Sequence, residues 1–491
     1  MKRKDFVTCR TVLWWMVFSG IGINYMLRVQ LNLVIVAIVV PPRKTSIIGQ
    51  CNGVIGDNIT WQDDSFSIFD DYQQDHENDS QEVQKSHLFP WNEYEQGLAT
   101  GAFYWIHMLS EIPGGMLARK YGTKSVFGIG NLLTILLGFL LPVAINYHLY
   151  ALIIIRVIQG FVGGLAYPAA HNMAAKWIPC NERSKFVSAY MGAGVGIGIA
   201  YPICAFIINY LSWEAVFYIG SMIGIVWYLA WYFLVFDTPM QHPRISEEER
   251  IYIENNVEVS SEFTSENKPV PWRRILTSVP FWMTIFANWS TVWGYFTLMI
   301  EAPAYFAFVH GWNINEVGIL SGFPHFFTMI FAWFFAQYSD WLLKTDRMTV
   351  TNVRKLATFF CTAAPALMVV GLSFSGCHSI LAIFFIMIGV ALVGSSSSGP
   401  LVILVDLSPN YASVLLGITG LIVDSAGFLS PLFVGLMINN NQTIERWQII
   451  FVITALNMVA GFLLYHIWGT AKQQPWNNYE AVMTNDNMEI R

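Results

Sequence analysis

The sequence predicts an all-α membrane protein with twelve transmembrane helices arranged as two bundles of six. Three observations lead to this fold class. Of the 491 residues, 54% are hydrophobic and 12% are charged, and the mean hydropathy is +0.45, whereas a soluble domain usually carries about 25% charged residues. Apolar stretches long enough to cross a bilayer recur along nearly the whole chain. A long hydrophilic segment divides these stretches into two groups of six.

Each apolar stretch is predicted to form one membrane-spanning helix. About 20 residues are needed to cross a hydrocarbon core of about 30 Å, and in lipid every backbone donor and acceptor must be paired within the segment. The first stretch is too long for the apolar region of a cleavable signal peptide. The predicted spans are 12-40, 94-116, 125-145, 149-172, 186-209, 213-236, 279-305, 314-338, 356-374, 378-405, 412-436 and 447-468.

The distribution of basic residues predicts that both termini are cytoplasmic. Of the 27 lysines and arginines, 21 fall on the side of the N-terminus, four fall in the opposite loops and two fall within spans, as the positive-inside rule requires. The glycosylation sequons at Asn58, Asn78 and Asn441 fall in loops predicted to be outer. We expect a multi-pass protein of the plasma membrane, with a lysosomal or vesicular membrane as the alternative.

The domain organisation follows from the same pattern. A cytoplasmic N-terminus at 1-11 precedes a six-helix bundle at 12-236, whose outer loop at 41-93 is polar and carries two of the sequons. A hydrophilic linker follows, then a second bundle and a cytoplasmic tail, at 237-278, 279-468 and 469-491. Within the linker, Ser246 and Glu249 have the spacing of a capping box that opens a short helix, and Pro271 is expected to begin another.

The six cysteines have neither metal-ligand nor CxxC spacing, so we expect no metal site. Cys51 and Cys377 both fall on the outer, oxidising side, where they could form a disulfide. The alternative, which we favour from the sequence, is that they are unpaired.

Two arginines interrupt apolar helices. Arg28 has Asn24 four residues before it and Asn32 four residues after it, so the first helix carries a polar stripe. Arg156 begins a similar stripe in the fourth helix, which continues through Gly160, Gly163, Gly164, Tyr167 and His171. Ionisable residues at membrane depth are costly and normally face a cavity or a partner.

These two arginines are candidate anion ligands, because a guanidinium can donate bidentately to carboxylate or phosphate. In this interpretation Arg28 and Arg156 hold the anion, and Asn32 and Tyr167 orient it. The alternative is a structural role, in which each arginine is tied to helix carbonyls or to a buried acid such as Glu111 or Asp424.

Several motifs carry a family resemblance. The stretch EIPGGMLARKYGTKSVFG (111-128) resembles the loop motif between helices two and three of the major facilitator superfamily. More specific are RVIQGFVGGLAYPAAHNMAAKWIPCNERS (156-184), APAYF, VGILSGFPH and DLSPNYASVLLGI. Together they resemble the anion:cation symporter family, which includes sodium-phosphate cotransporters, sialin and the vesicular glutamate transporters, and they look most like divergent, insect-type members similar to inorganic phosphate cotransporters.

The resemblance implies a major facilitator fold and an alternating-access carrier for organic anions or inorganic phosphate. The family's substrate-anchoring arginines correspond to Arg28 and Arg156. The sequence also departs from the family pattern: Gly163 stands where an acid implicated in proton coupling is common, and Thr100 and Thr291 stand where vesicular glutamate transporters have a histidine and an arginine. These departures argue against a glutamate transporter and against proton coupling through the usual acid.

Other ionisable residues could supply coupling or gating instead. His107 and Glu111 lie four residues apart on the second helix, Glu301 precedes APAYF, and Asp424 lies in the glycine-rich eleventh helix. A membrane acid beside a histidine or arginine is a candidate proton carrier. The alternative is that Glu111 and Asp424 pair with basic residues as part of the scaffold, and that Glu301 is a solvated residue at a helix end.

We therefore predict a secondary active transporter for an organic anion or phosphate, driven by a cation gradient or the membrane potential. It would act as a monomer in contact with lipid, need no cofactor beyond a co-transported Na⁺ or H⁺, and bind no nucleic acid. The alternatives are an uncoupled anion facilitator and a transporter-like sensor or scaffold. An enzyme is not expected, because the sequence has no P-loop and no catalytic constellation outside the predicted spans.

Overall fold

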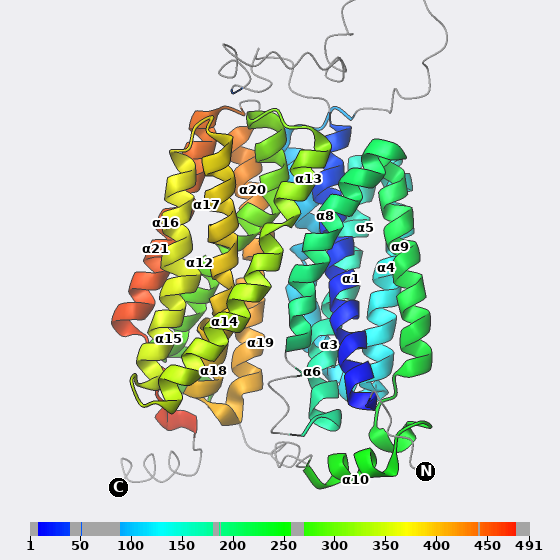
Figure 1. The fold of residues 1–491 in the computed structure, drawn as a ribbon, viewed down its shortest axis with the longest axis vertical. Helices are drawn as coiled ribbons and strands as arrows, with labels where there is room; N and C mark the ends of the chain where they lie inside the picture. Colours follow the sequence, from blue (N-terminus) through cyan, green and yellow to red (C-terminus); the bar gives the residue numbers. More distant parts are fainter. Residues whose placement is uncertain are drawn as a thin grey trace, which may run out of the picture.

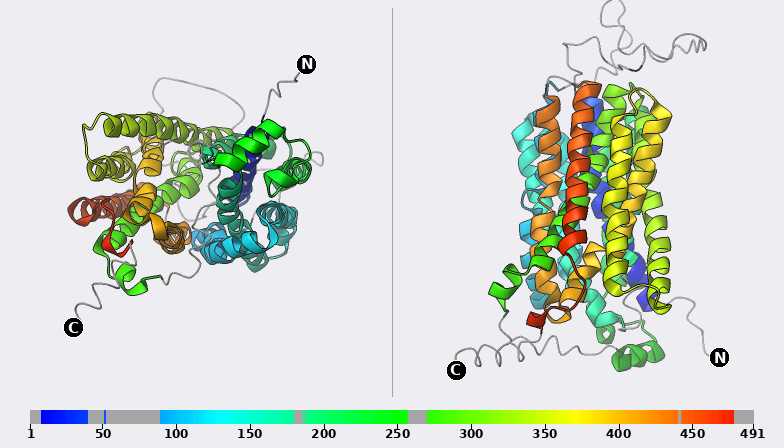
Figure 2. Two further views of the ribbon diagram at one scale, coloured as in Figure 1. Left: turned by 90° about the horizontal axis from the view of Figure 1, so that it is seen from below. Right: turned by 90° about the vertical axis from the view of Figure 1, so that its left-hand side faces the viewer.

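The computed structural model describes residues 8–39, 51, 89–179, 186, 188–256, 270–439 and 442–477. These residues form two groups of long helices that stand side by side (Figure 1). Seen along the helices, the N-terminal group and the C-terminal group occupy opposite sides of the molecule (Figure 2). We call the end at which the first helix begins and the last one stops the terminal end, and the opposite end the loop end.

Five continuous helical segments and one broken helix make up the N-terminal group. The segments are α1 (Cys9–Ile38), α2 (Glu93–Gly101) with η2 (Ala102–Tyr104) and α3 (His107–Tyr121), α4 (Thr123–Tyr147), α5 (Leu149–Gly164) with α6 (Ala166–Trp177), η4 (Ser188–Met191) with α8 (Gly192–Tyr210), and α9 (Trp213–Leu234).

The C-terminal group contains six spans, several of them interrupted by short 3₁₀ or π segments. They are α12 (Val279–Ala304) with η7 (Tyr305–Val309), α13 (Ile314–Gly322) with α14 (Pro324–Lys344), α15 (Val350–Thr358) with η8 (Phe359–Ala363) and α16 (Ala364–Ser373), α17 (Ser379–Leu392) with η9 (Val393–Ser398) and α18 (Pro400–Leu407), η10 (Pro409–Tyr411) with α19 (Ala412–Val423) and α20 (Ala426–Ile438), and α21 (Ile444–Trp468).

Eleven helices in the described part of the chain are long and apolar enough to span a membrane. The twelfth predicted span, 94-116, corresponds to α2, η2 and α3, which do not form one continuous helix. The helix breaks at Trp105 and Ile106, so neither part is long enough to be counted alone. Together the segments give the predicted twelve spans in two bundles.

Polar caps mark where several spans begin at the loop end. Asn92 and Glu95 form a capping box that opens α2, and Asn313 and Glu316 form another that opens α13. A capping box pairs two backbone N–H groups that a helix start would otherwise leave unsatisfied. Such caps allow each helix to begin at a defined residue.

The linker between the bundles contains two short helices, α10 (Glu247–Asn256) and α11 (Trp272–Leu276). Ser246 caps α10, since its hydroxyl accepts from the Glu249 N–H at 3.2 Å. The Glu249 carboxylate, however, does not complete the predicted capping box. It accepts from the backbone N–H groups of Cys9 and Arg10 and from Arg10 Nε at 3.1 Å. Helix α10 is thereby joined to the start of α1.

Contacts between the two bundles are most extensive at the loop end, where α2 lies along α20 and α8 lies along α13. Glycines allow these backbones to touch. A Cβ atom on Gly97 would lie 2.6 Å from the Pro431 carbonyl oxygen, and one on Gly435 would lie 2.5 Å from that of Glu93. On the other interface, a Cβ on Gly322 would lie 2.8 Å from the Gly198 carbonyl oxygen. The loop end is therefore closed in this structure.

The expectation that Cys51 and Cys377 are unpaired is wrong, because they form a disulfide with a Cα–Cα distance of 5.0 Å. Cys51 belongs to the segment between α1 and α2, and Cys377 lies between α16 and α17. The sequence could not decide this pairing, since it depends on how the two bundles are placed at the loop end. The bond covalently joins the two halves of the molecule there.

Candidate functional site

Arg28 lies in the middle of α1 and is buried, with 3% of its surface exposed. Its Nη2 donates to Asn24 Oδ1 at 3.3 Å and lies 2.8 Å from His107 Nε2. The guanidinium carbon also lies 4.2 Å from the ring centre of Tyr25, 4.5 Å from that of Phe103 and 5.3 Å from that of Tyr104. The break in the second span places His107 at the start of α3, beside this arginine.

Arg156 lies in α5 and is fully buried. Its Nη1 donates to Gln159 Oε1 at 3.0 Å, and its Nη2 donates to the backbone carbonyl of Arg28 at 2.9 Å. Gln159 in turn donates to the Thr134 carbonyl at 3.0 Å. Arg156 forms no ion pair with the described residues, and its Nε has no hydrogen-bond partner among them. A buried charge held only by neutral acceptors is electrostatically uncompensated.

The two guanidinium groups share one aromatic neighbour. The Phe103 ring centre lies 4.5 Å from the Arg28 guanidinium carbon and 5.1 Å from that of Arg156. Cation–π contacts offset part of the cost of burying each charge, but they do not remove the repulsion between two like charges. This arrangement favours an anion near the pair.

The C-terminal bundle presents aromatic and polar side chains on its side of the molecular centre, opposite the two arginines. The hydroxyl of Tyr295 in α12 lies 3.2 Å from His325 Nδ1. Asp424, directly after α19, interacts electrostatically with Arg28. Trp289 Nε1 donates to Ser425 Oγ at 3.1 Å. The centre of the molecule is therefore shared between the bundles, with the cations on one side and Asp424 on the other.

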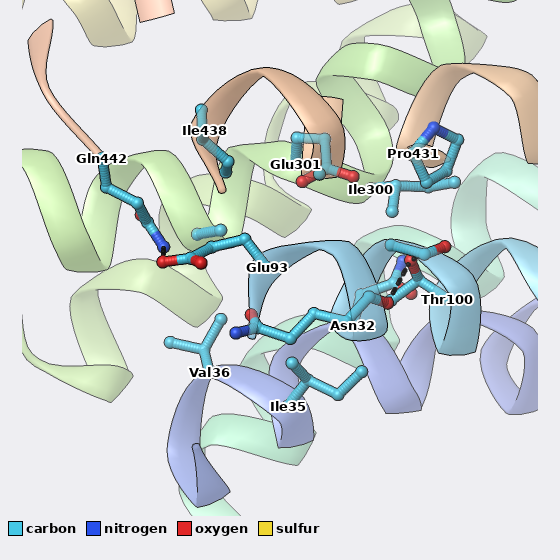
Figure 3. Close-up of a pocket in the computed structure, with 14 residues that line it drawn as sticks. Asn32, Ile35, Val36, Glu93, Thr100, Ile300, Glu301, Pro431, Ile438 and Gln442 are labelled. Atoms are coloured by element: carbon cyan, nitrogen blue, oxygen red, sulfur yellow. Dashed lines mark hydrogen bonds between the residues drawn. The ribbon is translucent and has the colours of Figure 1, made fainter. Parts of the chain in front are cut away.

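A cavity lies between the bundles (Figure 3), and the α1 residues that line it follow Arg28 in the sequence toward the loop end. Asn32, one helical turn from Arg28, lines it and donates to the Tyr201 hydroxyl at 3.2 Å. Its other polar lining residues come from α2, from α12 and from the segment before α21: Glu93, Gln96, Thr100, Glu301 and Gln442. Neither arginine lines this cavity.

The predicted site residues thus fall into two neighbouring groups. Arg28, Arg156 and His107 meet at the centre, with Asp424 within electrostatic range. Asn32 and Glu301 line the cavity toward the loop end. The side chains of Tyr167 and Glu111 lie outside the part of the chain that the structure describes, as do the sequon residues Asn58, Asn78 and Asn441.

Gly163, where an acid was expected from the resemblance, borders the same centre. A Cβ there would lie 3.2 Å from the Phe103 ring and 3.5 Å from Asn24 Nδ2. An acidic side chain at this position would therefore begin beside the ring that both arginines contact. Its replacement by glycine removes a negative charge from the surroundings of the arginine pair.

Several residues of the site were not predicted from the sequence. Gln159, which anchors Arg156, follows it at i+3 spacing, and this spacing was a usable signal. Phe103, Tyr104 and Tyr201 gave no such signal, because an aromatic residue in an apolar helix has the same appearance whether it packs in the core or borders a site.

The sequence profile of the Major Facilitator Superfamily matches residues 53–431, more than half of the chain. The chain belongs to this superfamily. Within it, the chain belongs to the anion:cation symporter family. It is 37% identical over 393 residues to vesicular glutamate transporter 1 of Xenopus laevis, covering 79% of this chain and 68% of that protein. It is 35% identical over 403 residues to vesicular glutamate transporter 2 of Homo sapiens, covering 81% of this chain and 69% of that protein.

The fold agrees with this assignment. A bacterial homologue of the human lysosomal transporter Spinster, in an inward-facing and occupied conformation, aligns with a TM-score of 0.63 at 14% identity and covers 93% of this chain and 96% of that one. The major facilitator fold predicted from the sequence is confirmed. This member of the superfamily is a multi-pass membrane transporter and not an enzyme, as predicted.

Proposed function

We propose that Arg28 and Arg156 form the central anion site of this transporter and that the cargo is an organic anion or inorganic phosphate. The observation that carries the proposal is the arginine pair itself: two guanidinium groups from α1 and α5 contact the same Phe103 ring. An anion between them would reduce their mutual repulsion and receive charge-assisted hydrogen bonds.

The arrangement also fits alternating access. The site lies between two bundles whose contacts are concentrated at the loop end, and rocking of one bundle against the other would expose it to each side in turn. Asn32 on the cavity side of Arg28 is placed to orient a ligand that enters through this cavity. His107, in contact with Arg28, fits a positioning role better than a coupling role.

The named substrate of the relatives is glutamate, and we propose a different preference here. Thr291 has its hydroxyl 2.6 Å from that of Thr362 and donates to the Ala287 carbonyl, so it is engaged inside the C-terminal bundle. Thr100 donates to the Gln96 carbonyl of its own helix. Neither threonine supplies the positive charge that the resemblance associates with glutamate transport.

We propose that the terminal end faces the cytoplasm, as the distribution of basic residues predicts, and that the plasma membrane is the site of action. This orientation places Asn58 and Asn78 on the outer side. Enzymatic removal of N-linked glycans should increase the gel mobility of the protein, and replacing Asn58, Asn78 and Asn441 together by glutamine should abolish that change. An unglycosylated protein with surface-accessible termini would contradict the orientation.

Anion uptake into proteoliposomes tests the transport proposal. The panel should include phosphate, glutamate and other organic carboxylates, under separately imposed proton, sodium and potential gradients. Arg156→Lys and Arg28→Ala should each lower uptake by about tenfold or more, because each removes a charge-assisted interaction of roughly 1.5–3 kcal/mol. Arg446→Lys, an exposed arginine of α21, is the matched control. Undiminished uptake in both site variants would refute the arginine assignment.

Uptake into proteoliposomes also distinguishes a coupled transporter from the second candidate function, an uncoupled anion facilitator. Gly163 leaves the arginine pair without a neighbouring acid on α5, which favours uncoupled facilitation. An uncoupled facilitator would equilibrate the anion without responding to an imposed proton or sodium gradient. A sensor or scaffold would bind the anion without moving it.

A further inference from the structure

Glu301 is an acidic residue within a membrane-spanning helix, close to the loop end of α12. Its carboxylate borders the cavity of Figure 3 and faces Asn32 and Thr100 across it. Among the described residues, this carboxylate forms no hydrogen bond and no ion pair. A carboxylate within a membrane-spanning segment is unfavourable while it stays ionised without a compensating charge.

The groups around Glu301 do not compensate its charge. From α2 the cavity receives a second acid, Glu93, which accepts a hydrogen bond from Gln442 Nε2 at 3.3 Å. Tyr201 of α8 donates its hydroxyl proton to the Met299 carbonyl at 2.7 Å and brings no charge. The lining residues of α1 and α20 carry no ionisable group, and Arg28 lies one turn deeper without lining the cavity.

The cavity depends on contact between the bundles. Its walls are α1 and α2 from one bundle and α12 and α20 from the other. The backbones of α2 and α20 touch at Gly97 and Gly435, both of which line it. Separation of α2 from α20 would open the cavity to water, where the Glu301 carboxylate would be hydrated.

We propose that Glu301 binds a proton from the loop side, and that the bundles close at the loop end only when this carboxyl group is protonated. Closure brings α2 and α20 together over the cavity and reduces the contact of Glu301 with water, so desolvation acts against the ionised form. Opening rehydrates the group, which then releases its proton to the water on that side. This inference deepens the proposed alternating-access function by naming a coupling residue.

The number of protons bound in each state determines whether a change of pH opens or closes the loop end. If the closed arrangement binds one more proton than the open one, acidification favours closure and alkalinisation favours opening, by up to about tenfold per pH unit. A sodium ion could also neutralise the Glu301 carboxylate, since Asn32, Glu93, Gln96 and Thr100 supply further side-chain oxygens to the cavity wall. The proposal commits to a proton, and a response to sodium at constant pH would count against it.

Hydrogen–deuterium exchange of the full-length protein in lipid nanodiscs tests the proposal without requiring a known substrate. The reporters are the peptides that cover 93–101 and 431–438, on the two sides of the closed interface. After correction for the intrinsic pH dependence of exchange, wild-type protection should fall between pH 6 and pH 8. Glu301→Gln, a neutral isostere, should stay protected at both values, and Glu301→Asp should retain the pH response.

Glu445→Gln serves as the matched control, because Glu445 is an exposed acid in the first turn of α21 outside the cavity. It should behave like the wild type. Three results would each overturn the proposal. They are a pH response that persists in Glu301→Gln, the absence of a pH response in the wild type, and a response to sodium at constant pH. Loss of anion uptake in the arginine variants with an intact pH response would leave this inference standing, so the two proposals can fail separately.

Discussion

Arg156 is held by neutral partners. Its contacts with Gln159 and with the Arg28 carbonyl fix the guanidinium without cancelling its charge. The geometry therefore separates two contributions that usually change together. One is the hydrogen bonding that stabilises the folded protein, and the other is the positive charge that attracts an anion.

Substitution of Gln159 tests this separation. Gln159→Leu should lower the thermal unfolding temperature, because it leaves a buried charged donor unsatisfied at a cost of about 1–3 kcal/mol. Gln159→Glu should keep the stability, since the new carboxylate pairs with Arg156, but it should lower anion uptake by about tenfold or more. Thermal unfolding of the purified protein and proteoliposome uptake give the two readouts. If Gln159→Glu transported like the wild type, the charge of Arg156 would not be used for the anion.

At the scale of single residues, the sequence predicted the charged side chains that interrupt an apolar helix. Arg28 and Arg156 are recognisable because each interrupts an apolar helix, and Glu301 is recognisable for the same reason. The partners of these residues were harder to predict. The contact of Arg28 with His107 depends on the break at Trp105 and Ile106, and the position of that break is decided by packing against other helices.

Among the elements, α2 and α20 form the most extensive contact between the bundles. The approach depends on glycines, since their backbones leave no room for a side chain at the contact. Helices joined in this way have two clear states, in contact or apart, because a small separation already loses most of the packing energy. The pair is therefore suited to opening and closing the loop end.

Gly97→Ala and Gly435→Ala should prevent this closure, because each new Cβ would collide with a backbone carbonyl of the opposite helix. We expect faster hydrogen–deuterium exchange over 93–101 and 431–438 and slower transport turnover. Gly417→Ala in α19 is the control, since a Cβ there meets no atom within 4 Å. It should leave both measurements unchanged or slightly stabilise the helix, by up to about 1 kcal/mol. Normal protection in the Gly97 and Gly435 variants would contradict the assigned contact.

Glu249 joins the linker helix α10 to α1, and the ring of Tyr252 in α10 adds a contact with the Arg10 guanidinium at 4.8 Å. Glu249 is 8% exposed and accepts three hydrogen bonds from Cys9 and Arg10. Partly buried, charge-assisted bonds of this kind are stronger than exposed ion pairs. The sequence predicted α10 and its Ser246 cap, but the contact with α1 joins residues that are 240 positions apart and left no local signal.

Glu249→Gln should therefore loosen α10 from α1. We expect trypsin to cleave at Arg244 and Arg250 several-fold faster than in the wild type, because local detachment exposes the backbone. Glu254→Gln removes only an exposed i,i+4 ion pair with Arg250 and is the matched control. Equal cleavage rates in the two variants would show that Glu249 does not hold the helix in place.

At the scale of the whole molecule, the sequence predicted two bundles and a hydrophilic linker because hydropathy alone marks the spans. It did not predict how the bundles meet, since every helix that is apolar on all sides can face either lipid or protein. The disulfide between Cys51 and Cys377 is an example of a contact between the bundles that hydropathy does not predict. Its two cysteines were identified as outer, yet their pairing depends on the assembled structure.

A gel experiment tests this covalent connection. A specific protease site inserted between Asn256 and Val270 would cut the linker between the bundles. Without reductant, the two fragments should run together at the size of the uncut chain, because Cys51 lies in one and Cys377 in the other. With reductant they should separate. Cys377→Ser should give two separate fragments under both conditions, and separation of the wild-type fragments without reductant would rule out the bond.

The disulfide also limits the distance between Cys377 and the loop end of α1. Twelve residue steps separate Val39, the residue directly after α1, from Cys51, and a chain of that length reaches at most about 40 Å when fully stretched. Cys377, bonded to Cys51, cannot lie farther than roughly this distance from the tip of the first helix. A reductant that reaches the loop end would remove this limit without altering Arg28 or Arg156, so the oxidation state of the disulfide and the proposed anion site can be varied independently.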